Sequence, residues 1–69
     1  MNFEATNTKL DAKVGAFLRV CGRPVDMDAV VNKIKPEGFS EFEIKESVWR
    51  LLDQHEAELT PERNIVAVA

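Results

Sequence analysis

Residue types that carry chemistry are scarce in this chain, which has 69 residues, one cysteine and one histidine. A standard zinc site is built mainly from several Cys and His ligands, which Cys21 and His55 alone do not supply, and no Cys-x-x-Cys motif is present. A Cys–His nucleophile pair would need a reactive thiol, whereas Cys21 falls on the apolar stripe of a predicted helix, the usual position of a buried, inert thiol. The acidic residues form no clustered pair, and no phosphate-binding glycine loop is present. We therefore expect no catalytic residue, no metal and no cofactor, and a chain that is not an enzyme.

Basic side chains are the next candidates, because Lys and Arg contact the phosphates and base edges of DNA. The candidate DNA contacts, with one asparagine among them, are Lys33, Lys35, Lys45, Arg50, Arg63 and Asn64. Most of them also have a simpler interpretation. Lys33 and Lys35 suit the negative end of a helix dipole. Lys45 and Arg50 each follow a glutamate by four residues, the spacing of an intrahelical ion pair.

Two aromatic residues, Phe42 and Trp49, are seven residues apart and so share one flank of a helix. One interpretation is that the hairpin, or an N-terminal arm with Phe3, covers them. The other is that they form an exposed anchor for another protein, since tryptophan is enriched in interface hot spots. Residues 41–54 carry four acidic and two basic side chains, whereas a helix that enters a DNA groove is normally neutral or basic. The net negative charge of residues 41–54 therefore favours a protein over DNA as the partner.

The first element expected to position these residues is a helix over about residues 9–21, where apolar residues recur at helical spacing. Thr8 is its expected N-cap, with Asp11 three residues later, and Gly22 is its left-handed stop. The face opposite the apolar stripe carries small residues: Ala12, Gly15 and Ala16. This face is either an ordinary exposed helix surface or the contact of a homodimer.

Two further helices, over about residues 27–35 and 41–54, follow from the same spacing. Asp26 caps the first of them. Ser40 and Glu43 have the spacing of a capping box at the start of the second. Both helices should therefore begin at well-defined positions.

The last segment changes to the period of a β-hairpin, with strands at about residues 57–60 and 64–68. In the turn between them, Asn64 is available for a left-handed residue. His55 stands at the end of the third helix, where a left-handed residue is common. Val25 is expected to pair as an edge strand of one or two residues.

The order of these elements is that of a winged helix-turn-helix, an α+β fold in which a short turn, here with Gly38, joins two of the three helices and a hairpin follows. Residues 48–54 and 58–63 resemble small bacterial winged helix-turn-helix proteins, in which an apolar recognition helix runs into a hairpin with a Leu-Thr-Pro turn. The resemblance implies DNA binding, with the third helix in the major groove and the wing along the backbone. Residues 1–7 would be a flexible arm, and residues 8–69 one domain.

Composition is compatible with a small soluble domain, with a net charge of −3, 45% hydrophobic and 30% charged residues. This charge disfavours strong nonspecific attraction to DNA or anionic membranes. One cysteine makes no internal disulfide, no signal peptide is evident, and no apolar run approaches the roughly 20 residues of a membrane span. We therefore expect a cytoplasmic protein without a membrane segment.

Two functions are left open by the sequence. One is a DNA-binding domain of a small transcriptional regulator, and the other is a protein-interaction module that uses Phe42 and Trp49. The resemblance favours the first and the acidic third helix favours the second. We place DNA binding first, because the basic side chains lie on the elements that would face a duplex.

Overall fold

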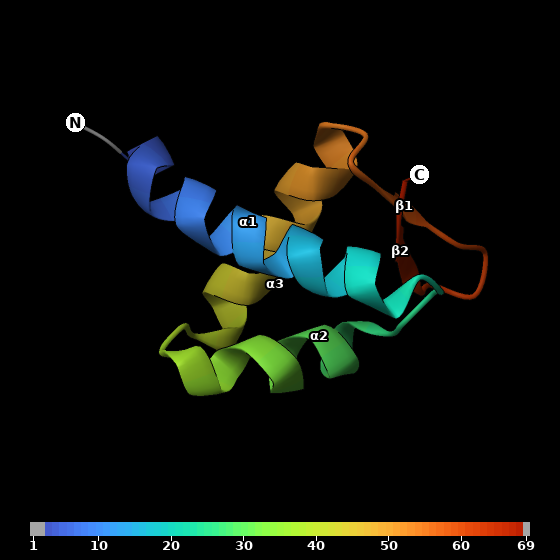
Figure 1. Ribbon diagram of the computed structural model, residues 1–69, viewed down its shortest axis with the longest axis horizontal. Helices are drawn as coiled ribbons and strands as arrows, with labels where there is room; N and C mark the ends of the chain where they lie inside the picture. The colour runs from blue at the N-terminus through green and yellow to red at the C-terminus, as the bar shows by residue number, and fades with distance from the viewer. Residues whose placement is uncertain (1–2, 69) are drawn as a thin grey trace.

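The computed structural model describes the backbone of residues 3–68 and the side chains of residues 8–68. Over this range the chain is an α+β arrangement of three α-helices, a short 3₁₀ helix and a two-stranded antiparallel hairpin (Figure 1). The elements are, in chain order, α1 (Phe3–Cys21), α2 (Met27–Ile34), the 3₁₀ helix η1 (Lys35–Glu37), α3 (Glu41–Asp53), β1 (Ala57–Leu59) and β2 (Ile65–Ala67). The predicted α+β class, with three helices before a hairpin, is confirmed.

The start of α1 differs most from the prediction. The helix begins at Phe3, so the N-cap predicted at Thr8 is wrong, and residues 3–7 of the predicted arm are helical. Residues 1–2, the rest of that arm, lie outside the described part of the chain. Residues 3–8 contain no glycine or proline, and a helix that is already anchored in a core extends by a turn without a new nucleation step.

The N-termini of α2 and α3 are capped as predicted. The Asp26 carboxylate accepts a hydrogen bond of 2.8 Å from the Ala29 N–H. The Glu43 N–H donates to the Ser40 hydroxyl at 3.1 Å, and the Ser40 N–H donates to the Glu43 carboxylate at 2.9 Å, which completes the capping box. After α2 the chain continues as the 3₁₀ helix η1, which contains Pro36. Proline is tolerated there because the first turn of a helix does not need its N–H.

The C-terminus of α3 is a Schellman motif centred on His55. The His55 N–H donates to the Leu52 carbonyl at 3.1 Å, and the Glu56 N–H donates to the Leu51 carbonyl at 2.9 Å. His55 has a φ of 62°, which confirms the left-handed residue predicted there. Histidine enters this region more readily than most residues, but less readily than glycine.

Replacing His55 with glycine should stabilise the chain, because glycine removes the Cβ that the left-handed conformation strains. We expect His55→Gly to raise the free energy of unfolding by roughly 0.5–1 kcal/mol, the larger backbone entropy of unfolded glycine offsetting part of the gain. Urea denaturation followed by circular dichroism measures it. His55→Ala keeps a Cβ and is the matched control. Equal stabilities of the two variants would contradict the prediction.

The hairpin has its predicted position, but its turn differs in one detail. β1 and β2 pair antiparallel, with Leu59 opposite Ile65. The left-handed residue of the turn is Arg63, with a φ of 68°, and not Asn64 as predicted. The Arg63 N–H donates to the Thr60 carbonyl at 2.9 Å, so the turn closes over four residues and its left-handed position falls one residue earlier.

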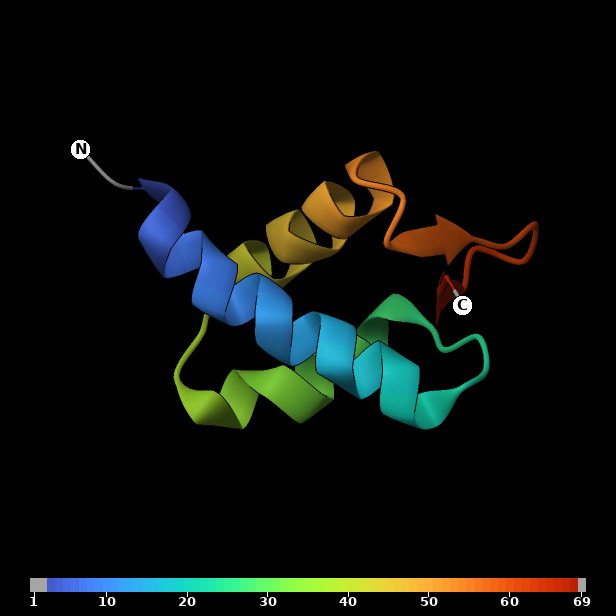
Figure 2. The ribbon, with the colours of Figure 1, turned by 45° about the horizontal axis from the view of Figure 1, so that its top comes forward.

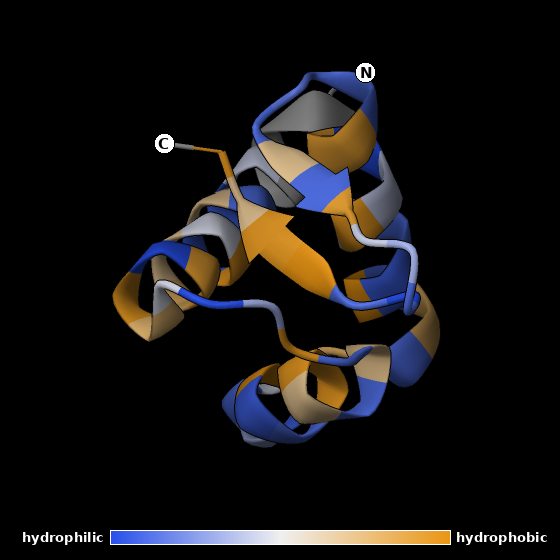
Figure 3. Cartoon of the chain, turned by 90° about the vertical axis from the view of Figure 1, so that its right-hand side faces the viewer, coloured by the Kyte–Doolittle hydropathy of each residue, from blue (hydrophilic) through white to orange (hydrophobic). Residues whose placement is uncertain are grey.

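β2 lies in the middle of the side of the molecule that Figure 3 shows, and all of its residues are hydrophobic. One edge of β2 pairs with β1. On the other edge the Ile65 N–H and carbonyl bond to Val25 at 2.7 and 2.9 Å, which confirms the short edge strand predicted there. In both Figure 1 and Figure 2, α1 crosses α3 and α2 lies below α1.

The core lies where the three helices meet the inner face of the hairpin. Its buried apolar side chains are Leu10, Val14, Leu18, Val30, Val31, Ile34, Ile44, Val48, Leu51, Ala57 and Ile65. The helical members follow the predicted apolar stripes. No helix over residues 3–68 is both long and apolar enough to span a membrane.

Candidate functional site

Large apolar side chains are exposed on the outward flank of α3 and on the hairpin. Phe42 is 69% exposed and Trp49 is 56% exposed, both on the outward flank of α3. Leu59 of β1 is 52% exposed. The hairpin therefore leaves both aromatic residues open to solvent, and the interpretation that it covers them is wrong. The side chain of Phe3, the other predicted cover, lies outside the described residues.

A hollow of about 360 Å³ lies beside Trp49, between α3 and the hairpin. Its lining residues are Met27, Val48, Trp49, Leu52, Leu59, Arg63 and Ile65. Leu59 and Ile65 are opposite each other in the hairpin and so present their side chains on the same face, which forms one wall. We call Trp49, Leu52 and Leu59, with this hollow between them, the apolar patch.

Lys45, a predicted DNA contact on α3, is paired within its own helix. Its Nζ lies 2.9 Å from Oε2 of Glu41, which confirms the predicted pair. The hydrogen bond and the charge of Glu41 raise the pKa of Lys45, and those of Lys45 lower the pKa of Glu41. Such an exposed pair contributes little to stability. It does neutralise the positive charge of Lys45 on the outward flank of α3.

Arg50, the other basic residue of α3, forms a bidentate ion pair with Asp11 of α1. Its Nε donates to Oδ2 at 3.0 Å and its Nη2 to Oδ1 at 2.9 Å. The buried Ser47 hydroxyl donates to the same carboxylate. The hydrogen bond to Asp11 raises the pKa of Arg50. The spacing had indicated Glu46 as the partner of Arg50, and Asp11 as a partner of the cap at Thr8; instead, Asp11 and Arg50 connect two helices.

The remaining predicted DNA contacts do not gather on one surface. Lys33 and Lys35 are exposed near the end of α2, and Lys33 lines a hollow between α1 and α2. Arg63 is exposed on the hairpin turn and lines the hollow of the apolar patch. Asn64 is half-buried, and its backbone N–H donates to the Thr60 hydroxyl at 3.0 Å. Lys33 and Arg63 thus line different hollows.

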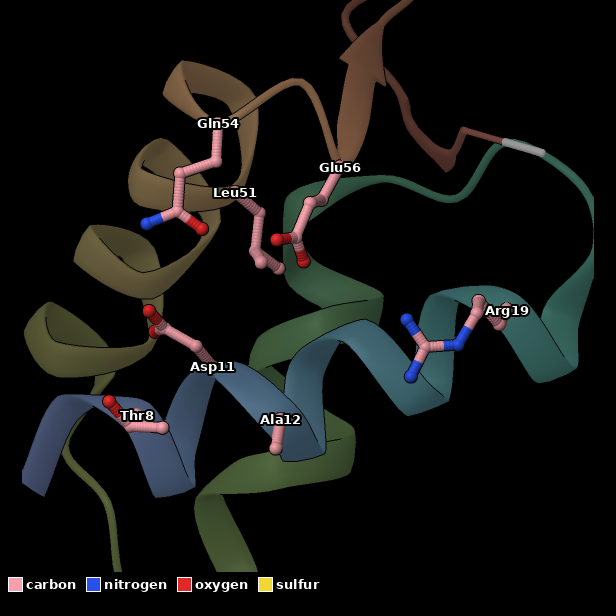
Figure 4. A pocket seen from close by; sticks show the side chains of 7 residues that line it. All are labelled: Thr8, Asp11, Ala12, Arg19, Leu51, Gln54 and Glu56. Carbon is pink, nitrogen blue, oxygen red and sulfur yellow. The ribbon is translucent and has the colours of Figure 1, made fainter. Parts of the chain in front are cut away.

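The small-residue face of α1 is interrupted at Gly15. Ala12 and Ala16 are exposed, but Gly15 is buried, and a Cβ on it would lie 3.3 Å from Nη1 of Arg19. The side chain of Arg19, one turn later, therefore lies over the glycine. In Figure 4 the side chains of Arg19 and Glu56 point into the same space, between α1 and the end of α3. Ala12 and Ala16 thus remain open to solvent while Arg19 covers Gly15, and the homodimer stays a prediction.

Two residues of this arrangement were not singled out from the sequence. Ser47 lies on the core side of α3, between Ile44 and Leu51, and a hydroxyl at such a position signals a buried hydrogen bond. Nothing in the sequence indicated that Leu59 is exposed, because its exposure depends on how the hairpin packs against α3. Within residues 8–68, no group of three or more His, Cys, Asp or Glu side chains is placed to hold a metal ion.

Comparison of the chain with protein-family models, with curated proteins and with solved structures found no match. The side chains of the α3–hairpin surface therefore carry the functional conclusion.

Proposed function

We propose that the chain is a winged helix-turn-helix domain that binds another protein through the apolar patch. The winged form is supported by the hairpin after the third helix and by the pairing of Val25 with β2. The observation that carries the binding proposal is the exposure of Trp49 beside an apolar hollow. Exposed apolar surface of this kind marks interaction sites in soluble domains, and tryptophan is enriched in interface hot spots.

The charges on α3 support a protein partner over a nucleic acid. Lys45 and Arg50 are each bound to a carboxylate, so contact with a phosphate would cost an existing ion pair. Glu46 and Asp53 are exposed on the same helix. DNA binding depends on cations that replace counterions along the phosphate backbone, and this helix presents acidic side chains instead.

Peptide display tests the proposal without a known partner. A library of random 16-residue peptides is selected on the immobilised full-length chain and counter-selected on Leu59→Glu, which places a charge in the apolar patch at an exposed position. We expect peptides that bind the original chain and not the variant. Amide spectra confirm that the variant is folded. Failure to recover any Leu59-dependent peptide would overturn the proposed function.

DNA binding is the second candidate, and the observation that favours it is Arg63, exposed on the turn that would lie along a duplex backbone. A nuclear magnetic resonance titration with a 20-base-pair duplex at low salt tests it. We expect the α3 and hairpin amides not to shift. If they do shift, the protein-binding assignment of α3 fails. In that case Arg63→Ala should reduce the slope of log affinity against log salt concentration by about one unit, the value for one phosphate contact.

A further inference from the structure

The spacing of the exposed aromatic residues on α3 matches a helix as the binding partner. Phe42 and Trp49 are seven residues apart, which is about 10.5 Å along a helix axis. A second helix laid along α3 repeats its own side chains at the same interval, as in helix-in-groove recognition with anchors at i and i+7. The hollow beside Trp49 has a mainly apolar lining, which suits one such anchor.

The charges beside these aromatic residues are mainly negative. Lys45 and Glu46 both lie between Phe42 and Trp49 on the helix surface. The charge of Lys45 is paired within the helix, so Glu46 carries the unpaired charge there. Asp53 follows Trp49 by one turn. Both carboxylates are exposed, and neither has an ion pair with the residues that the structure describes. Arg63, on the other wall of the hollow, supplies one positive charge.

We infer that the partner segment is an amphipathic helix that carries Lys or Arg beside its apolar anchors. Its apolar side chains cover Trp49 and the hollow, and its cations lie against Glu46 and Asp53. Complementary charge of this kind sets orientation and selects the partner. The inference rests on the proposed function, and it adds the conformation and the charge of the segment that binds.

The peptides selected on the full-length chain test the inference, together with charge-reversal variants. We expect these peptides to have an excess of Lys and Arg and apolar residues at helical spacing. Glu46→Lys combined with Asp53→Lys should weaken their binding about tenfold or more, because like charges then face each other. The matched control is Glu58→Lys, a carboxylate on the opposite face of β1 from Leu59, which should leave the affinity within about twofold of the original.

The possible failures separate the inference from the proposed function. Leu59-dependent peptides that are neutral or acidic, or that bind the double lysine variant as tightly as the original chain, overturn the inference and leave the proposed function standing. Peptides that bind in an extended conformation, as judged by circular dichroism of the complex, do the same. If no Leu59-dependent peptide is recovered, both fail.

Discussion

Replacing Arg50 with methionine should lower the free energy of unfolding by about 2–3 kcal/mol, because it leaves a largely buried carboxylate without its cation. The Asp11 side chain is 17% exposed and that of Arg50 is 28% exposed, so water replaces the lost bonds only in part. A chain of this length has a total stability on the order of 5 kcal/mol. The variant should therefore lose about half of it, which urea denaturation followed by circular dichroism measures directly.

A double-mutant cycle with Asp11→Ala separates the ion pair from side-chain packing. We expect the two substitutions together to cost less than the sum of the single ones, by about 1–2 kcal/mol, since the residues are in direct contact. Lys45→Met is the matched control: it breaks the exposed pair with Glu41 and should cost less than about 0.5 kcal/mol. Equal losses for Arg50→Met and Lys45→Met would show that the pair between α1 and α3 contributes little to stability.

Features of the fold that depend on neighbouring residues could be predicted from the sequence. The caps at Asp26 and Ser40 and the left-handed His55 each involve hydrogen bonds between residues only a few positions apart. The start of α1 was predicted wrongly, because Thr8 offers a cap signal but residues 3–8 contain no glycine or proline that stops the helix from extending past it. Where such a signal is missing, packing against the rest of the molecule decides how far a helix extends.

The contacts of the site were harder to predict, because they join distant parts of the chain. Asp11 is 36 residues from Ser47 and 39 residues from Arg50. Spacing along the helix predicted a local partner for each charged residue: Thr8 for Asp11 and Glu46 for Arg50. A long-range pair was nonetheless preferred, because a bidentate, partly buried ion pair with an added hydroxyl bond is stronger than a surface pair four residues apart. The exposure of Trp49 likewise depends on the placement of the hairpin.

Replacing Trp49 with alanine should strongly weaken peptide binding while leaving the fold intact. Because a central tryptophan is a typical hot spot, we expect the affinity for a selected peptide to fall by roughly 30-fold or more, or about 2 kcal/mol. Trp49 is more than half exposed, so the free energy of unfolding should fall by no more than about 2 kcal/mol, which leaves the chain folded. Fluorescence anisotropy of a labelled peptide measures the affinity, and urea denaturation measures the stability.

Val14 is the matched control, since it is fully buried in the core on α1 and does not line the hollow. Val14→Ala should show the reverse pattern, a loss of stability of about 2 kcal/mol from the cavity left in the core and little change in the affinity of the folded protein. If Trp49→Ala instead destabilises the chain as much as Val14→Ala and binds the peptide normally, Trp49 is a packing residue and the apolar patch is not the binding surface.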